Sequence, residues 1–255
     1  MIFSSSLYLK SGVLISGFSG RNFRTTQEET LRFSFKSKEG VEKVIENVCR
    51  LKKSLEFSEA KFIMARQIHS DKIIEISGEN LTSDSIAEIE GDSILTDSQN
   101  LLLGVITADC IPILIYEKNS GFIATVHAGW KGTSQHIVSK VLKKMSGYGG
   151  HNSSFKIFMG PHIKAFCYEI KEDLFEPFAE YKEFILKKEN SYYLDLTGIN
   201  LAQIRQAIPD SSRLEISVLD CCTHCAVDTF FSYRKEGVSA GCNLSFIGIK
   251  DGRIN

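Results

Sequence analysis

The residues best suited to chemistry in this chain lie in the segment TADCIPILIYEKNSGFIATVHAGWKGT, residues 107–133. Within it, Cys110 follows an apolar run at 101–106 and His127 follows another at 121–126, and both runs have the composition of buried strands. A thiol and an imidazole at the ends of neighbouring strands form either a nucleophile–base pair or two ligands of one metal ion. The alternative without chemistry is a buried cysteine beside a histidine that is satisfied by hydrogen bonds.

A third candidate ligand is His69, which comes after an expected strand at 60–65. Zinc in catalytic sites takes three protein ligands and leaves one position for water or substrate, so two histidines and one cysteine match the expected number. The long spacing between the three residues differs from the short loops of a closed structural zinc finger. A metal-binding histidine also needs a hydrogen-bond acceptor on its other ring nitrogen. The acidic candidates for that acceptor are Asp92, Asp97 and Asp109.

Basic and aromatic residues near these segments could bind a substrate. Arg66 precedes Gln67 and lies close to His69 in sequence, where an arginine would form a fork for an anion, although arginine is also common at surfaces. The segment FFSYRKEG, residues 230–237, contains two phenylalanines, a tyrosine and two cations. It could hold a ring and an anion around Arg234, or form a buried aromatic pair beside a solvated turn.

The loop HAGWKGT, residues 127–133, contains the only tryptophan, Trp130, and two glycines that allow close approach of the backbone. Because the loop leads into an expected helix at 133–145, its free amides could receive an anion. It is too short for a phosphate-binding P-loop and lacks the GK[ST] motif in register.

The motif CCTHC at residues 221–225 combines a CxxC spacing with a histidine, which by itself suggests zinc or redox chemistry. A structural zinc site needs a second pair of ligands, and no other CxxC occurs in the chain. We therefore favour a role in packing and loop geometry for this motif.

The composition is that of a globular protein without a basic surplus for nucleic acid. The 255 residues are 43% hydrophobic and 24% charged, and 30 basic residues balance 31 acidic ones to a net charge of −1. The N-terminus lacks the pattern of a signal peptide, and no apolar run approaches the roughly 18 residues of a membrane span. We expect a soluble cytoplasmic protein whose seven cysteines are free thiols or metal ligands.

The alternation of expected strands and helices without regular βαβ units predicts a mixed α/β (α+β) fold. We expect a single domain, 1–255, with a mixed β-sheet core and flanking helices. Thr197 is the expected cap of the last helix. The expected strands are 13–18, 60–65, 72–76, 101–106, 111–116, 121–126, 155–159, 192–194 and 216–219, and the expected helices are 40–55, 133–145, 173–184 and 196–208.

Taken together, these segments resemble the YfiH-type proteins, a family labelled laccase-like, polyphenol oxidase or peptidoglycan editing factor and regarded as purine nucleoside phosphorylases. The matching segments run in order from about residue 66 to 241. The combination of TADC with VHAGW is the most specific of them. The segments are RQIHSDKI, GDSILTD, TADCIPILIYE, VHAGWKGT, GPHIKAFCYEI, DLTGINLAQI and CCTHCAVDTFFSYRKEG.

The resemblance implies one α/β domain with a mixed sheet, and zinc held by His69, Cys110 and His127. It also implies that phosphate cleaves adenosine, inosine and methylthioadenosine, with adenosine deamination as a second activity. The substrates are then purine nucleosides and phosphate, and the oligomeric state is open.

The proton shuttle of such a deaminase is a glutamate in known zinc enzymes, but no HxE motif occurs here. Asp109 or Asp92 would take that role, and the sequence does not distinguish between them. The candidates for contacts with nucleoside and phosphate are Arg66, Gln67, Lys131 and Arg234.

Three positions depart from the usual pattern of the family. The segment GFSGRNFRTTQEE, residues 17–29, replaces a glycine-rich GGVS-like loop. Phe166 stands where the first of two cysteines is usual, and Cys242 stands where an arginine is usual. These changes leave the metal ligands intact and bear on nucleoside preference and phosphate contacts.

Three rival functions remain at this point. In a Cys–His hydrolase, Cys110 would attack an amide, such as that of a peptidoglycan precursor, with His127 as its base, but this dyad does not need His69. A copper-dependent polyphenol oxidase needs several copper ions, which six histidines and one Cys/His₂ site do not supply, although copper could occupy the site adventitiously. A metal-storing or partner-binding protein would have a closed site without turnover.

Overall fold

The computed structural model describes the chain except for residues 1, 10–11, 22–37, 78–80, 82 and 252–255. The part of the 17–29 segment that follows Arg21 therefore lies outside the described residues.

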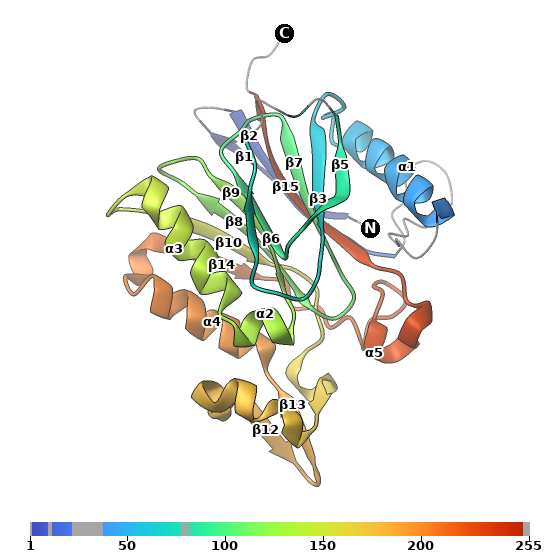
Figure 1. Ribbon diagram of the computed structural model, residues 1–255, viewed down its shortest axis with the longest axis vertical. Helices are drawn as coiled ribbons and strands as arrows, with labels where there is room; N and C mark the ends of the chain where they lie inside the picture. Colours follow the sequence, from blue (N-terminus) through green and yellow to red (C-terminus); the bar gives the residue numbers. More distant parts are fainter. Residues whose placement is uncertain (1, 10–11, 22–37, 78–80, 82, 252–255) are drawn as a thin grey trace.

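Strands form two six-stranded sheets and one small sheet (Figure 1). In order across the first sheet lie β1 (Ile2–Leu9), β2 (Gly12–Ser19), β15 (Asn243–Asp251), β7 (Leu101–Thr107), β3 (Lys61–Arg66) and β5 (Ser85–Glu90). Across the second lie β14 (Leu214–Val218), β10 (Phe155–Met159), β8 (Ile111–Glu117), β9 (Ile123–Ala128), β6 (Ser93–Thr96) and β4 (Ile73–Glu75). The third contains β11 (Glu169–Ile170), β13 (Ser191–Leu194) and β12 (Ile185–Lys188).

Helices and 3₁₀ turns flank these sheets. The α-helices are α1 (Lys38–Ser54), α2 (Trp130–Ser134), α3 (Ile137–Gly149), α4 (Leu196–Ala207) and α5 (Tyr233–Glu236). The 3₁₀ helices are η2 (Ala165–Cys167), η3 (Glu172–Leu174), η4 (Glu176–Phe184), η5 (Ser211–Arg213) and η6 (Gly237–Ser239).

Three buried apolar clusters show that the elements stack as helix, sheet, sheet and helices. Val48 of α1 packs in one cluster with Phe62 of the first sheet, so α1 covers the outer face of that sheet. Leu103 and Leu114, one from each large sheet, share the cluster between the sheets. Leu142 of α3 belongs to the third cluster, in which α3 and α4 cover the second sheet, as Figure 1 also shows.

The prediction of a mixed α/β fold is confirmed, and the sequence did not show that the strands divide into two large sheets and a small one. The expected helix at 133–145 is interrupted at His136, whose φ of 61° separates α2 from α3. The expected helix at 173–184 consists of 3₁₀ turns with non-helical dihedrals at Phe178 and Tyr181. Strands β1, β5, β6, β11, β12 and β15 were not predicted.

The expected cap of α4 was also wrong. The Asp195 side chain accepts a hydrogen bond from the Gly198 amide and caps the helix. The Thr197 hydroxyl lies 2.6 Å from His162 Nε2 instead. A carboxylate one residue before the first turn therefore took the role that we assigned to the threonine.

Strand pairing brings the candidate ligands together at the ends of neighbouring strands in the two large sheets. β3 and β7 are parallel neighbours, so their carboxyl ends, which lead to His69 and Cys110, point the same way. β8 and β9 are antiparallel and pair Pro112 with His127, so Cys110 at the start of β8 lies beside the end of β9. The prediction that thiol and imidazole lie at neighbouring strand ends is confirmed.

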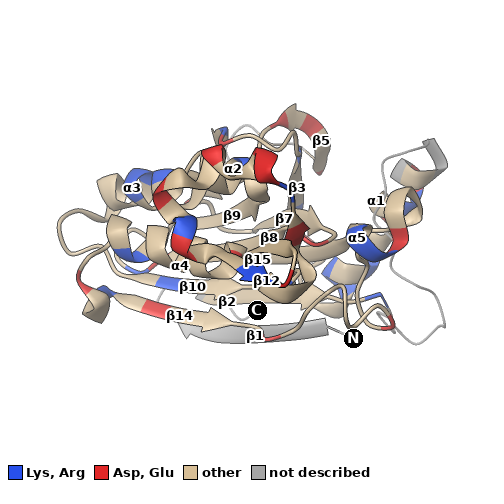
Figure 2. Ribbon diagram, turned by 90° about the horizontal axis from the view of Figure 1, so that it is seen from below, with Lys and Arg blue, Asp and Glu red and all other residues tan. Residues whose placement is uncertain are grey.

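No helix in the described part of the chain has the length and apolar composition needed to cross a membrane. Basic and acidic residues are interspersed on the ribbon in Figure 2, in line with the net charge of −1. The expected cytoplasmic location and the single-domain boundaries at 1–255 stay predictions.

Candidate active site

Three side chains from different strand ends converge on one point. One donor atom each from His69, Cys110 and His127 lies within 4.8 Å of the other two. The two imidazole rings are edge to face, with centroids 4.7 Å apart. His127 is buried, whereas His69 is exposed and so forms the outer side of the cluster. A thiolate and two imidazoles are a donor set that zinc binds, so the residues fit the metal that the sequence predicts.

Asp92 supports both histidines from behind. Its Oδ1 lies 2.7 Å from Nδ1 of the buried His127, which leaves Nε2 on the side of Cys110. The same carboxylate accepts hydrogen bonds from the amides of His69 and Ser70, at 3.0 and 2.7 Å. It thereby holds His69 in a left-handed conformation with φ of 57°. Asp92 therefore has the position expected of a hydrogen-bond acceptor that orients a metal-binding histidine.

Asp97, another candidate for this acceptor, is exposed just beyond the opposite end of β6. β6 runs antiparallel to β9 and pairs Ser93 with Val126, so only its amino end, at Asp92, meets His127.

The charges in the cluster depend on one another. Burial raises the pKa of the Cys110 thiol, but the charge of His127 and hydrogen bonds to both imidazoles outweigh burial and lower this pKa to about 6. Burial lowers the pKa of His127, but Cys110 and Asp92 raise it to about 9. Burial raises the pKa of Asp92, and hydrogen bonds from His127 and Ser70 bring it down to about 2. These shifts favour a thiolate at Cys110 beside a charged imidazole and a carboxylate when no metal ion competes for the donor atoms.

Gly129 leaves space for this cluster. A Cβ atom at this position would lie 2.9 Å from Cys110 Sγ and 3.7 Å from His127 Nε2. Any larger residue would therefore push against the donor atoms, which explains a glycine in the loop after β9.

The cluster forms part of the wall of a cavity of about 660 Å³. This volume is within the range of about 300–1,000 Å³ for sites that bind small molecules. Apolar and aromatic side chains make up much of the rest of the wall, including Trp130, Ile163, Tyr168, Leu196 and Tyr233.

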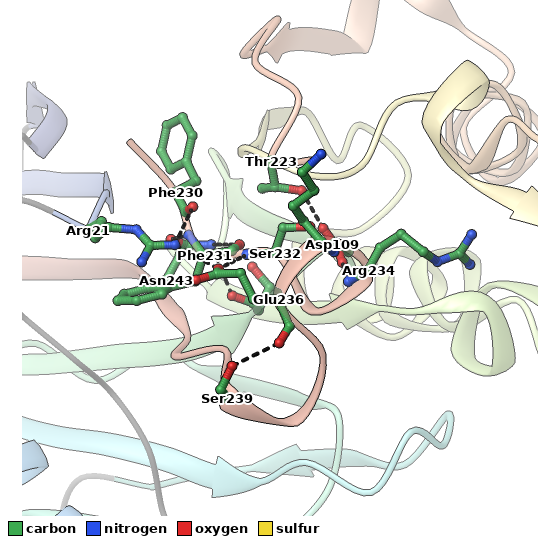
Figure 3. Close-up of polar contacts among 12 residues, drawn as sticks. Arg21, Asp109, Thr223, Phe230, Phe231, Ser232, Arg234, Glu236, Ser239 and Asn243 are labelled. Carbon is green, nitrogen blue, oxygen red and sulfur yellow. Dashed lines mark hydrogen bonds and ion pairs between the residues drawn. The ribbon is translucent and has the colours of Figure 1, made fainter. Parts of the chain in front are cut away.

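Asp109, directly before Cys110, also faces the cavity and is only 8% exposed. Its carboxylate accepts hydrogen bonds from the Thr223 hydroxyl and from the Arg234 amide, both at 2.6 Å (Figure 3). Its φ of 94° is rare for a residue with a side chain, and such strain persists where surrounding contacts hold it. These two contacts hold both carboxylate oxygens of Asp109 in place.

The predicted substrate residues divide into two groups. Arg66, Gln67 and Arg234 line the cavity, whereas Lys131 is exposed outside its lining, with its ammonium 5.5 Å from the Trp130 ring centroid. The side-chain amide of Gln67 donates a hydrogen bond to the Ile106 carbonyl at 2.7 Å and accepts one from the Ile106 amide at 2.9 Å. It thereby extends the pairing of β3 with β7.

The two arginines are held differently. Arg66 is exposed and forms an ion pair with Glu90 at 2.5 Å. Arg234 donates a hydrogen bond to the Glu169 carbonyl at 2.8 Å, and its guanidinium lies 5.0 Å from the Tyr168 ring centroid.

The aromatic segment at 230–237 is divided between the core and the cavity wall. Phe230 and Phe231 are buried in the core, while Tyr233 and Arg234 line the cavity. Arg21 fixes this segment because it forms an ion pair with Glu236 at 2.6 Å (Figure 3).

Sequence reasoning missed Tyr168, whose ring forms a wall of the cavity. It lies in the segment GPHIKAFCYEI, which the family resemblance had already marked, so a signal for it was present. Ile163 and Leu196 were also missed, because an apolar side chain in a cavity wall has the same sequence pattern as one in the core.

Comparison with known proteins assigns the chain to a family. A family model described as multi-copper polyphenol oxidoreductase laccase matches residues 15–250. The chain belongs to this family. The resemblance seen in the sequence segments is thereby confirmed.

Relatives of this laccase-like chain have names from nucleoside chemistry. A protein of Clostridium acetobutylicum named purine nucleoside phosphorylase is 36% identical over 228 residues, which are 88% of this chain and 89% of the relative. A protein of an unknown prokaryote named adenosine deaminase is 30% identical over 158 residues, covering 59% of this chain and 58% of the relative. The crystal structure of YfiH from Bacillus licheniformis has the same fold, with a TM-score of 0.80, 23% identity and coverage of 95% and 97%.

The departures from the laccase-like family pattern lie at different places. Cys242 is part of the cavity wall, where the resemblance to the family had implied an arginine. Phe166 is 63% exposed and does not line the cavity.

Proposed function

We propose that this protein is a zinc-dependent purine nucleoside phosphorylase that acts on adenosine, inosine and methylthioadenosine, with adenosine deamination as a second activity. The observation that carries the proposal is the position of the Cys/His₂ cluster in the wall of a cavity that also contains aromatic rings and two arginines. The names of the relatives support the substrate class.

Base and phosphate would occupy different parts of the cavity. The rings of Tyr168 and Tyr233 offer faces on which a purine can stack. Arg66 and Arg234 supply guanidinium groups, which match phosphate geometrically and have further N–H donors beyond those used within the protein. We assign the phosphate to these arginines, and a role of Lys131 stays a prediction from sequence.

In phosphorolysis, a phosphate oxygen forms a bond to the anomeric carbon of the ribose as the bond to the purine nitrogen breaks. The electron pair of that bond goes to the purine, which takes up a proton. Asp109 is our candidate for moving this proton, because this acidic residue lines the cavity next to Cys110. Asp92 lies behind His127 and acts by holding both histidines in place.

His69, Cys110 and His127 would hold the zinc ion. When three side chains bind it, zinc acts as a Lewis acid and lowers the pKa of water to about 7, which is the chemistry that deamination at purine C6 requires. The Asp109 carboxylate would then carry a proton to the departing ammonia. Multinuclear copper chemistry finds less support. A further histidine, His162, is not available as a copper ligand, because its two ring nitrogens form hydrogen bonds with the Gly160 carbonyl and the Thr197 hydroxyl.

Chromatography of a reaction with adenosine or inosine tests the proposal. With phosphate present, free base and ribose 1-phosphate should form in equal amounts. Without phosphate, base release should stop while deamination of adenosine continues, because water is the nucleophile in that reaction. Base release at the same rate without phosphate would show a hydrolase and contradict the proposal.

A second candidate function is a thiol hydrolase. Cys110, His127 and Asp92 lie in the order nucleophile, base and orienting carboxylate, and the Cys110 pKa of about 6 is that of an activated thiol. The position of His69 favours a metal site over a hydrolase, because its ring also contacts the Cys110 thiol and a hydrolytic triad does not require a second histidine.

Alkylation of Cys110 separates the two functions. With zinc bound, the thiolate is shielded, so we expect slow alkylation that a chelator accelerates. In chelator-treated protein the rate should be level above pH 6 and fall about tenfold per pH unit below it, because protonation removes the reactive thiolate. Peptide mapping locates the label among the seven cysteines. Fast alkylation before chelation, with activity lost in parallel, would instead establish the hydrolase.

A further inference from the structure

A second group of metal-binding side chains lies outside the cavity lining. The donor atoms of Cys167, His224 and Cys225 are all within 4.8 Å of one another. The sequence motif at 221–225 had no visible partner pair, but the fold brings Cys167 to it from the η2 turn, 58 positions before Cys225. The Cys167 and Cys225 sulfur atoms are 3.3 Å apart. This distance is well above the roughly 2.05 Å of a disulfide and somewhat below the roughly 3.8 Å between two thiolates on tetrahedral zinc.

Cys222 adds a third thiol to this group. Its thiol lies outside the group within 4.8 Å but near enough to Cys167 and Cys225 to interact with both electrostatically. The Lys164 amide donates a hydrogen bond to Cys222 Sγ at 3.4 Å. Backbone N–H groups that point at a sulfur stabilise a thiolate, and such supporting contacts are typical of metal ligands. Cys222 and Cys225 also have the CxxC spacing of structural zinc sites.

We propose that Cys167, Cys222, Cys225 and His224 bind a second zinc ion in a closed Cys₃His site. Four protein ligands leave no position for substrate, in contrast to the three ligands at the cavity. Such a site is structural, and its existence does not rest on the proposed activity.

The contacts around the second site indicate what it would hold together. His162 and Cys222 form an isolated parallel bridge, and the Thr223 amide donates to the His162 carbonyl at 3.1 Å. The residues next to the ligands belong to the cavity: Tyr168 follows Cys167 and lines it, and Thr223 donates to Asp109. A metal ion here would join the two segments that position the ring of Tyr168 and the carboxylate of Asp109.

Cobalt titration of the full-length Cys110→Ser variant, made metal-free under reducing conditions, tests the second site by itself. This variant lacks the thiolate of the first site, so any thiolate-to-cobalt charge-transfer absorption must arise from other cysteines. We expect one equivalent of cobalt to produce this absorption and zinc to displace it. Adding Cys167→Ser, Cys222→Ser or Cys225→Ser should remove or strongly reduce it, and His224→Ala should weaken the binding.

Cys221→Ser is the matched control, because this cysteine is adjacent in sequence to Cys222 but, unlike Cys222, is not among the thiols that interact with Cys167 and Cys225 in the described chain. Cys49→Ser, on α1, is a remote control. Both should leave the absorption unchanged. Absence of the absorption in Cys110→Ser, equal loss in Cys221→Ser, or a Cys167–Cys225 disulfide that persists under reduction and excludes metal would overturn the proposal.

As a second measurement, metal analysis of the protein with Cys110 intact should show one zinc equivalent fewer in Cys167→Ser than in the unchanged chain. Equal zinc content in these two proteins would also overturn it. If the first site binds no zinc, the difference of one equivalent remains, so failure of the proposed function and failure of the second site can be distinguished.

Discussion

His69→Ala is expected to abolish tight zinc binding at the cavity and, with it, nucleoside cleavage. One of three ligands is lost, so the loss in affinity should exceed the roughly 10–100-fold that removal of a supporting partner costs. The side chain is exposed, so the variant should keep its fold and melt near the temperature of the unchanged protein. Cys110→Ala and His127→Ala should lose the metal in the same way. Equilibrium dialysis with zinc and the phosphorolysis assay measure both effects.

His127→Ala should also be less stable, because it leaves the buried Asp92 carboxylate without its partner at 2.7 Å. Asp92→Asn should be intermediate, with a loss in zinc affinity of about 10–100-fold. His151→Ala is the matched control, since this histidine is exposed and belongs to neither metal group. If His69→Ala bound as many zinc equivalents as the unchanged protein, with the same affinities, the three-ligand site would be ruled out.

Asp109→Asn is expected to lower kcat by roughly 10²–10⁴-fold, the usual contribution of a positioned proton-transfer group. An amide keeps the size of the carboxylate but cannot take up or release a proton. The pH–rate profile should lose one of its limbs in the variant, because the group that titrates in the reaction is gone. Stopped assays over a range of pH, with bound zinc measured in parallel, give this result.

A purely structural role of Asp109 makes a different prediction, and Thr223→Val separates the two. This variant removes the 2.6 Å hydrogen bond to Asp109 but keeps the carboxylate, so it should lower kcat less and preserve both limbs. If Asp109→Asn and Thr223→Val lowered kcat equally and left the profile unchanged, Asp109 would be a positioning residue only.

Local sequence patterns were sufficient for most strands and for the main ligands. The apolar runs around Cys110 and His127 form β7, β8 and β9 as expected, because continuous burial demands continuous apolar sequence. β5 was missed, because only its first residue, Ser85, is fully buried, so no continuous apolar run marks the strand. The expected helix at 173–184 failed for a related reason, since its apolar residues pack within irregular 3₁₀ turns.

Contacts between distant segments were beyond the reach of sequence patterns. Asp92, Asp97 and Asp109 were equivalent as partners for His127 until the antiparallel pairing of β6 with β9 selected Asp92. Likewise, no spacing rule connects Cys167 with Cys225.

The sequence alone determined the chemical types at the site and the strand ends that carry them, because those depend on residue identity and on short-range periodicity. The tertiary structure alone decided which carboxylate orients the buried histidine, which aromatic rings line the cavity, and which thiols gather near the surface. These outcomes depend on how strands pair and sheets pack, which is a property of the whole chain and not of any one segment.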